Sequence, residues 1–432
     1  MAFPMRFDRA AARGRASRGI CTRALANACQ VMIYAPITDR INFISRPSAR
    51  RDQAVRVPRA KRVPAIDAAR GAAMVLVCLA HFASKYILPA GGDAPGTWLP
   101  FVGHIASPMF FVISGSMVGY LFATHPETFG RVRATLAKRA VFFLTAGHLL
   151  ILGAHARSLN DLTGSARMLF VTDTIALALL LSPRLLRIPP RVRLAGAVAV
   201  YAASCALVYL SEPHGLAWRI VKDTFVGIDG DGFWEYNVPV LQWLAVHAAA
   251  TVLGPRLAEP LSRTGRMRIE QLLASVGCAV VAMGAVVRLF CLILVDHVMA
   301  PGGRAAFVAR QLASPWQRVP PSPVHLLLFS GLALLGISVV FALERRGVLA
   351  SLLAWLTVLG KTSAFVFILQ FYVFYVIVPA LVPLSLTMAP FVFFAAMLAI
   401  GEAARIWLHR RSKFTRPSWF IGATPVIPVP ET

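Results

Sequence analysis

Asp67, Arg70 and His81 stand in one largely apolar stretch, RVPAIDAARGAAMVLVCLAH (residues 62–81), and their types and spacing suit chemistry. Asp67 and Arg70 are three residues apart, so on a helix they are neighbours that can form an ion pair. Arg70 and His81 are eleven apart, which at about 100° per residue places both within roughly 20° of one face. An arginine can bind an anion such as phosphate, and an imidazole can act as a base or nucleophile. The pattern predicts a charged pair at one depth of a helical face and a histidine about 16 Å further along.

A second histidine, His104, is expected at a similar depth. The next apolar run begins near Leu99 and crosses in the opposite direction, which puts His104 about 8 Å from that end. His81 lies roughly 24 Å along the first run, close to the same end. Two histidines at one level on consecutive antiparallel helices are a candidate base or nucleophile pair. The alternative is that both lie at the membrane interface and hydrogen-bond lipid or neighbouring side chains.

The elements that would position these residues are membrane helices. Of the 432 residues, 57% are hydrophobic and 15% are charged, whereas soluble domains carry about 25% charged residues. This composition, with many long apolar runs, predicts an all-α, polytopic membrane bundle. The net charge of +25 falls in short clusters between apolar runs, as in cytoplasmic loops, and does not indicate nucleic-acid binding. The six cysteines form no CxxC pair, which predicts neither a disulfide framework nor a zinc site.

A transmembrane helix needs roughly 20 mainly apolar residues, and we expect about ten such spans. They cover approximately residues 65–88, 99–123, 139–156, 167–183, 192–211, 236–255, 271–297, 323–343, 363–383 and 386–408. The apolar segment 350–359 is too short to span and is expected to be interfacial or re-entrant. The spans define a predicted transmembrane domain of residues 62–410, followed by a cytoplasmic tail, 411–432.

The N-terminal extension, residues 1–61, is rich in arginine and poor in acidic residues, and it shows no sustained periodicity. This composition is typical of a transit peptide. A disordered basic tail and an extension from an upstream start codon are the alternatives. We expect the segment to be disordered and to lie outside the fold.

The distribution of lysine and arginine predicts that both termini are cytoplasmic. With the N-terminus inside, the inner loops and the C-terminal tail hold nineteen such residues, and the outer loops hold eight. The two longest outer loops, 211–236 and 298–322, are therefore candidates for contact with an external substrate.

Other ionisable residues in the expected spans are costly in lipid and need partners. His148 and His247 are isolated, and we expect each to hydrogen-bond across a helix pair. Glu402 and Arg405, three residues apart, are expected to form a local ion pair. Arg288 lies deep in its expected span and needs a partner or a polar cavity, and Asp173 is a candidate partner.

Six segments, in order along the chain, resemble motifs of the heparan-α-glucosaminide N-acetyltransferase catalytic-domain family. The opening stretch resembles that family's R…DxxRG…H pattern. The other five segments are HIASPMFFVISGSMVGYL (104–121), LAKRAVFFLTAGHLLIL (136–152), YNVPVLQWLAVHAAATVLG (236–254), QRVPPSPVHLLLFSGLALL (317–335) and LGKTSAFVFILQFYVFYV (359–376). The wider clan includes glucan succinyltransferases and the acyltransferase-3 proteins, whose Arg-x10-His arrangement Arg70 and His81 reproduce. Three positions depart from the family pattern: Ala80 replaces a common acidic residue, Leu241-Gln242-Trp243 replaces a Pro–Trp pair, and Gln370 replaces a histidine.

The resemblance implies an enzyme that moves an acyl group, usually acetyl, from cytoplasmic acyl-CoA to a sugar on the far side of the membrane. Arg70 would hold the donor's phosphates, with Asp67 orienting it, and His81 or His104 would deprotonate the acceptor or carry the acyl group. The residues expected to line the substrate passage are Ser114, Asp173, Arg288 and Gln370. For Ser114 and the adjacent Ser116, close packing of small residues between helices is the alternative.

We therefore expect an acyltransferase of the bacterial inner membrane, with acetyl-CoA or another acyl-CoA as donor and no metal. The expected partners are membrane lipids and a glycan or lipid-linked sugar acceptor, with no nucleic acid, and the chain can form an oligomer. A transporter or flippase is one alternative, although inverted halves are not recognisable in the sequence. A non-catalytic relative is the other, and Ala80 and Gln370 favour it.

Overall fold

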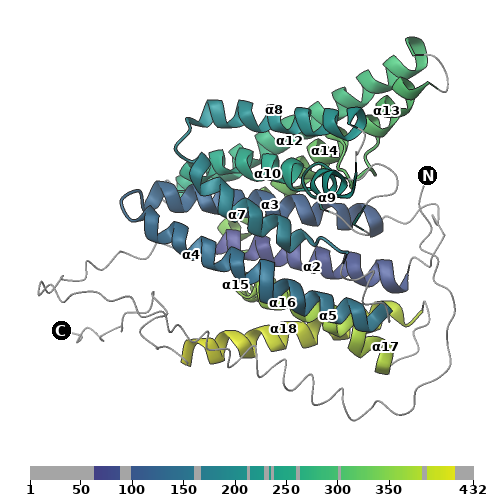
Figure 1. The fold of residues 1–432 in the computed structure, drawn as a ribbon. Coiled ribbons are helices and arrows are strands. Elements are labelled where there is room, and N and C mark those ends of the chain that lie inside the picture. The colour runs from purple at the N-terminus through teal and green to yellow at the C-terminus, as the bar shows by residue number, and fades with distance from the viewer. Residues whose placement is uncertain are drawn as a thin grey trace, which may run out of the picture. The chain divides into compact units, whose positions relative to one another are not determined.

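The computed structural model describes residues 63–87, 99–159, 167–211, 215–227, 233–234, 238–258, 263–299, 303–381 and 387–413. All of them belong to one compact unit. The predicted N-terminal extension lies outside the described residues, and so does the C-terminal tail beyond residue 413. Every regular element within the described ranges is helical, which confirms the all-α fold (Figure 1).

The helices follow one another along the chain. They are α2 (Pro64–Tyr86), α3 (Leu99–Thr124), α4 (Phe129–Phe142), η1 (Phe143–Gly147), α5 (His148–Leu159), α7 (Val171–Leu185), α8 (Pro190–Leu210), α9 (Gly215–Phe225), α10 (Val240–Ala250), η2 (Thr251–Leu253), α11 (Gly254–Leu257), α12 (Arg263–His297), α13 (Arg304–Ala313), α14 (Pro323–Arg346), α15 (Ala350–Lys361), α16 (Ser363–Tyr372), η3 (Val373–Ile377), α17 (Val378–Leu381) and α18 (Ala389–Lys413).

Eight helices in the described residues are long and apolar enough to cross a membrane, as a polytopic membrane protein requires. They correspond to eight of the ten expected spans. The other two, expected at 167–183 and 236–255, contain the 15-residue α7 and the 11-residue α10. α7 begins late because Asp173 accepts a hydrogen bond from the Phe170 backbone N–H at 2.9 Å and so caps the first turn. α10 begins directly after Pro239, and a proline disfavours helical backbone at the residue before it.

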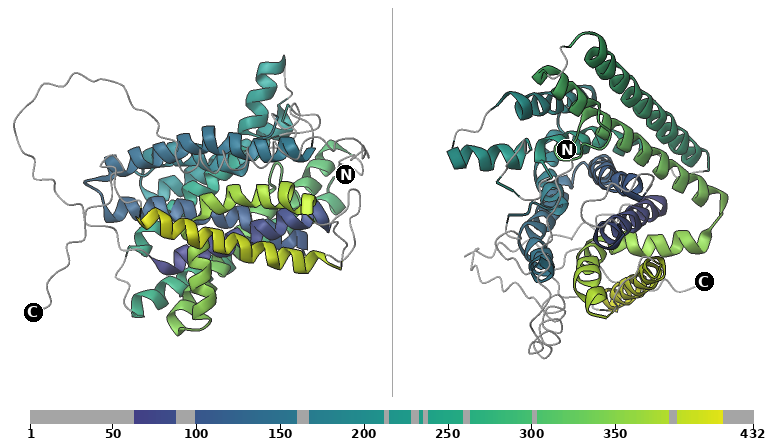
Figure 2. Two further views of the ribbon diagram at one scale, coloured as in Figure 1. Left: turned by 90° about the horizontal axis from the view of Figure 1, so that it is seen from below. Right: turned by 90° about the vertical axis from the view of Figure 1, so that its right-hand side faces the viewer.

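α2 and α3 lie at the centre of the described bundle, with the other spans around them in the end-on view (Figure 2, right). The buried face of α2 is rich in alanine. α3 meets α10 through Gly115 and meets η2 and α11 through Gly119. A Cβ atom at either glycine would lie about 2 Å from a backbone carbonyl oxygen, 2.2 and 2.1 Å away respectively. Such small residues allow helices to approach closely in a membrane, where the packing of side chains replaces the hydrophobic effect.

The bundle has two ends, which α2 connects. α3 runs antiparallel to α2, and Gly103 near the start of α3 lies against Ala80 near the end of α2 (Figure 1). We call the end that holds the first turns of α2 the Arg70 end and the opposite end the His81 end. A rise of 1.5 Å per residue separates the levels of Arg70 and His81 by about 16 Å.

The segment expected to be interfacial or re-entrant forms α15, which lies across α2 at the Arg70 end rather than along it (Figure 2). Two glycines make this crossing possible. A Cβ atom on Gly71 would lie 1.9 Å from the Leu356 carbonyl oxygen, and one on Gly360 would lie 1.8 Å from the Asp67 carbonyl oxygen. The two backbones are therefore in direct contact at the turn that carries Asp67 and Arg70.

Two spans contain a π-helical segment. η1 lies between α4 and α5, and η3 lies between α16 and α17. The two spans pack against each other, and the Tyr372 hydroxyl donates to the Leu150 carbonyl oxygen at 2.8 Å. A π-helical turn holds one more residue than an α-helical turn and is often found near functional residues.

Candidate functional site

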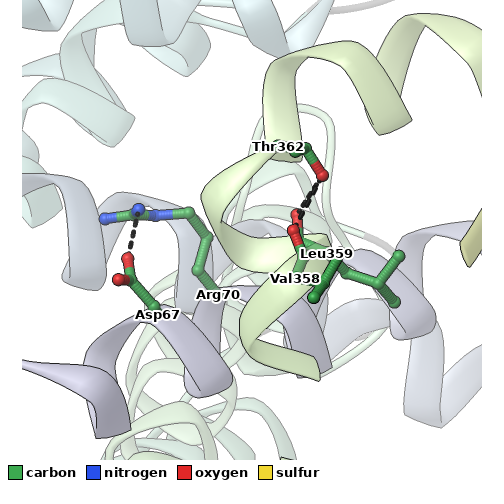
Figure 3. A network of polar contacts seen from close by, with 5 residues as sticks. All are labelled: Asp67, Arg70, Val358, Leu359 and Thr362. Atoms are coloured by element: carbon green, nitrogen blue, oxygen red, sulfur yellow. Dashed lines mark hydrogen bonds and ion pairs between the residues drawn. The ribbon is translucent and has the colours of Figure 1, made fainter. Parts of the chain in front are cut away.

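The Asp67–Arg70 ion pair forms as the spacing predicts. Arg70 Nη1 lies 3.2 Å from Asp67 Oδ1, and both side chains are partly buried (Figure 3). α15 holds this turn of α2 from one side through the Gly71 and Gly360 contacts. Thr362 then ends α15 by donating its hydroxyl hydrogen to the Val358 carbonyl oxygen at 2.8 Å. The guanidinium is thus oriented by a carboxylate on a backbone turn that cannot shift without moving α15.

His81 lies at the other end of α2 and contacts α16. Its Nδ1 is 3.2 Å from Nε2 of Gln370, a side chain with no exposed surface. The imidazole ring also packs against Phe371, with ring centroids 4.8 Å apart. Gln370, which stands where the resembled motif has a histidine, therefore contacts the histidine of the first span directly.

The Gln370 amide controls the tautomer of His81. When the amide nitrogen donates to Nδ1, the neutral imidazole carries its proton on Nε2. When the amide is turned over, its oxygen accepts from Nδ1–H, and Nε2 is left without a proton. A base at Nε2 requires the second arrangement.

His155 on α5 completes this group and was missed in the sequence. Its ring centroid lies 5.0 Å from that of Phe371 and 4.9 Å from that of Tyr375. A signal was present, because His155 follows His148 by seven residues and so falls close to the same helical face. Lys85 lies over the Tyr375 ring, 5.5 Å from its centroid, and brings a cation to the edge of the group.

His104 has its ring neighbours on a different part of the structure. Its centroid lies 5.2 Å from that of His325, 5.2 Å from that of Phe329 and 5.8 Å from that of Trp316. The contact of Gly103 with Ala80 agrees with a shared level for the two predicted histidines. However, His81 faces α16 and His104 faces α14, so each has a separate partner.

His325 was also missed in the sequence. The Ser322 hydroxyl caps the first turn of α14 by accepting the His325 backbone N–H at 2.9 Å. His325 Nδ1 lies 2.8 Å from the Pro315 carbonyl oxygen. A carbonyl oxygen only accepts, so Nδ1 carries the proton and Nε2 of the neutral ring is free of one. The motif PPSPVH, with a histidine in the first turn after a serine cap, was the available signal.

Arg318 is within electrostatic range of both groups of histidines, the group around His81 and the group around His104. Its exposed side chain interacts electrostatically with His81, His104 and His325. It belongs to the segment just before α14, within the predicted outer loop 298–322. This loop therefore borders the histidines, as expected for a loop that meets a substrate.

The other predicted outer loop, 211–236, is held by a buried carboxylate. Asp223 in α9 accepts the Phe233 backbone N–H at 2.6 Å. Burial raises the pKa of the Asp223 carboxyl, and this hydrogen bond partly opposes the shift. Lys222 donates to the Ser211 carbonyl oxygen at 2.8 Å and fixes the start of the same loop.

Ser114, predicted to line a passage, lies between α3 and α10. Its hydroxyl oxygen is 3.2 Å from His247 Nε2, which confirms the predicted cross-helix hydrogen bond of that histidine. The Ser116 hydroxyl donates to the Ala250 carbonyl oxygen at 3.2 Å. With Gly115 between them, these serines form the close packing that was the alternative interpretation.

Asp173 does not pair with Arg288, so that prediction was wrong. Asp173 Oδ2 lies 2.9 Å from His148 Nδ1, which confirms the predicted cross-helix bond of His148. The pairing fails because α7 packs against α4 and α10, whereas α12 packs against α13 and α14. A second predicted pair, Glu402–Arg405, does form, at 2.8 Å.

Arg288 was expected deep in its span, with a partner or a polar cavity. Its side chain is exposed on α12. Gly284, one turn earlier, lies against Leu327, so Arg288 is level with the first turn of α14. α12 has 35 residues and is about 52 Å long, which exceeds the hydrocarbon core of roughly 30 Å. An arginine near the end of the neighbouring span does not need a carboxylate partner.

Two cavities lie at the Arg70 end. One, of about 360 Å³, lies between α15 and α18 next to Trp355 and the Glu402–Arg405 pair. The other, of about 350 Å³, lies between α3, the start of α8 and α11. No three metal-binding side chains gather in the part of the chain that the structure describes.

Residues 63–135 match a protein-family model described as an acyltransferase domain. The matched stretch covers α2, α3 and the start of α4, and it contains Asp67, Arg70, His81 and His104. The match supports the wider acyltransferase-3 clan and a membrane acyltransferase in general. The narrower resemblance to heparan-α-glucosaminide N-acetyltransferases stays a prediction. No curated protein matches the chain.

Proposed function

We propose that this chain transfers an acyl group from acyl-CoA, bound at the Arg70 end, to a glycan or lipid-linked sugar at the His81 end. One observation carries the proposal: the stretch that matches an acyltransferase domain holds an oriented arginine at one end of α2 and histidines at the other. The charge distribution of the loops supports a cytoplasmic Arg70 end. The bacterial inner membrane is the proposed location.

Arg70 supports donor binding at this end. Asp67 engages Nη1 and orients the guanidinium, which can bind a phosphate through paired N–H groups. Partial burial strengthens this attraction, because the local dielectric is lower than in water. The thioester would then reach the level of His81 along α2, over about 16 Å.

A histidine at the other end would act as the base. The acceptor hydroxyl or amine gives its proton to an imidazole nitrogen, and its oxygen or nitrogen forms a bond to the acyl carbon. The carbon–sulfur bond of the thioester breaks, and the sulfur leaves with a proton as the free thiol. In the alternative route the histidine itself accepts the acyl group and passes it to the acceptor.

A polar side chain lies beside each candidate histidine, and the one beside His81 controls the tautomer of that histidine. For His81 this is Gln370, and for His104 it is His325, whose Nε2 is free of a proton. Arg318 would stabilise the negative charge that develops on the acyl oxygen if the acyl group is transferred next to its guanidinium. No metal is required for these steps.

Donor binding is the test of this function. Purified protein should bind acetyl-CoA, and Arg70→Ala should weaken binding by about tenfold or more, since a charge-assisted hydrogen bond is lost. Arg405→Ala is the matched control, because Arg405 also follows an acidic partner by three residues but is exposed on α18. Equal binding by the two variants would reject Arg70 as the donor site. Substrate uptake into proteoliposomes without acyl-CoA would indicate a transporter instead.

A further inference from the structure

Arg193, in the first turn of α8, is a buried arginine without a carboxylate partner in the described residues. Its side chain is only 6% exposed. Nη1 makes long contacts to the carbonyl oxygens of Leu185 and Ile188, at 3.5 and 3.3 Å. Nε is buried and has no acceptor. Carbonyl oxygens, one of them from Leu185 at the end of α7, are thus its acceptors in the described residues. A buried charge is costly unless it is paired with an opposite charge, so an anion beside Nε would stabilise this guanidinium.

The cavity of about 350 Å³ lies directly at this side chain. Arg193 and Arg187 supply its cationic wall, and Gly119, Phe122 and Pro255 supply much of its apolar wall. The cavity is at the Arg70 end, because Gly119 is in the last turns of α3. Space for a ligand and an unpaired buried donor therefore occur at the same place.

The charged side chains that line the cavity are both cationic. Arg187 is exposed at the rim. The N-terminus of the 21-residue α8 begins at Pro190, and its first N–H groups and helix dipole favour an anion. Large apolar side chains are also exposed near the rim, namely Ile188, Val192 and Leu194. Two arginines beside exposed apolar side chains suit a molecule that has both a phosphate and an apolar part.

We infer that this cavity binds the phosphate group of an amphiphile. Arg193 contacts the phosphate inside the cavity, and Arg187 contacts it at the rim. The same chemistry is found in anionic phospholipid headgroups and in acyl-CoA. A lipid there would be a structural or regulatory ligand and goes beyond the proposed function. A CoA phosphate would deepen that function and, in this case only, the inference rests on it.

Direct binding distinguishes the two sources without any turnover. Coenzyme A binding is measured by titration calorimetry. Retention of phosphatidylglycerol is measured by native mass spectrometry after reconstitution in vesicles of phosphatidylglycerol and phosphatidylcholine. Arg193→Gln should weaken one of the two ligands by about tenfold to a hundredfold, and Arg187→Gln should weaken the same ligand to a smaller extent. Arg191→Gln is the control, because Arg191 is exposed on the same turn and does not line the cavity.

Each outcome decides the inference. Selective loss of phosphatidylglycerol assigns a lipid, and selective loss of coenzyme A assigns the donor. Unchanged binding of both ligands to a folded Arg193→Gln protein overturns the site. If Arg193→Gln does not fold, the exposed Arg187→Gln decides in the same way. Loss of coenzyme A binding in Arg70→Ala alone supports the proposed function while rejecting this cavity as a donor site.

Discussion

The two ends of α2 are built from different kinds of contact. At the Arg70 end, carboxylates orient arginines, as in Asp67–Arg70 and Glu270–Arg345, and glycines bring helix backbones together. At the His81 end, imidazoles pack on aromatic rings and bond to amide or carbonyl groups. The first arrangement is rigid and charged, which suits retention of a multiply charged ligand. The second holds groups that exchange a proton, which suits chemistry.

Replacing Gly71 should produce the largest effect on stability, because the substitution disrupts the backbone contact between α2 and α15 at the Arg70 end. A Cβ atom in Gly71→Ala would lie 1.9 Å from the Leu356 carbonyl oxygen, so α15 must move away. We expect a loss of about 3 kcal/mol or more in the free energy of unfolding. Thermal unfolding of the detergent-solubilised protein measures it. Gly336→Ala is the control, since a Cβ atom there has open space in another helix. Equal melting of the two variants would show that the contact of Gly71 with α15 does not hold the Arg70 end together.

Removing a histidine should affect activity rather than folding. His81→Ala or His104→Ala should lower acetyl transfer by about 10²- to 10⁴-fold, which is the usual contribution of a general base. The larger loss identifies the base. His297→Ala serves as a control, because His297 is exposed at the end of α12. Full activity in both single variants would remove the chemistry from the His81 end.

These two predictions concern contacts that could be predicted from the sequence to different extents. Asp67–Arg70 and Glu402–Arg405 were predictable, because each depends on rise and rotation within one helix. The level of the two histidines was predictable because consecutive spans run in opposite directions. The facing partners Gln370 and His325 were not, because they depend on which helices pack together. Asp173–Arg288 failed for the same reason.

The fold shows a similar division. Hydropathy located eight spans because burial in lipid requires long apolar runs. It overestimated α7 and α10, where Asp173 and Pro239 set the helix starts. The crossing of α15 over α2 could not be predicted, since Gly71 and Gly360 are far apart in the chain.

Substitution of Gln370 separates orientation from packing at the His81 end. Gln370→Leu keeps a similar volume but removes the hydrogen bond to His81 Nδ1. We expect turnover to fall by about tenfold while the thermal midpoint changes little. Gln370→His, which restores a polar partner, should recover most of the rate. An equal loss in both variants would mean that Gln370 contributes shape only.

The smallest expected effect is at Asp223, where the outer loop carries a buried acid. Its raised pKa means that the folded state binds the proton more tightly than the unfolded state, so the charged form costs stability above the unfolded value of about 3.8. Asp223→Asn should therefore melt slightly higher than wild type at pH 7. The difference should shrink as the pH falls towards 4. A lower melting temperature for Asp223→Asn at pH 7 would contradict the buried-acid interpretation.

The π-helical segment η3 gives the His81 end a simple way to change its contacts in evolution. Such a segment is equivalent to an α-helix with one residue inserted, so deletion of one residue between Val373 and Ile377 would leave a regular helix. Residues before the deletion, including Gln370, would keep their places. Those after it would rotate by about 100° and rise by about 1.5 Å less. Deletion of a single codon would thus bring the end of this span against new neighbours, while Gln370 beside His81 stays in place.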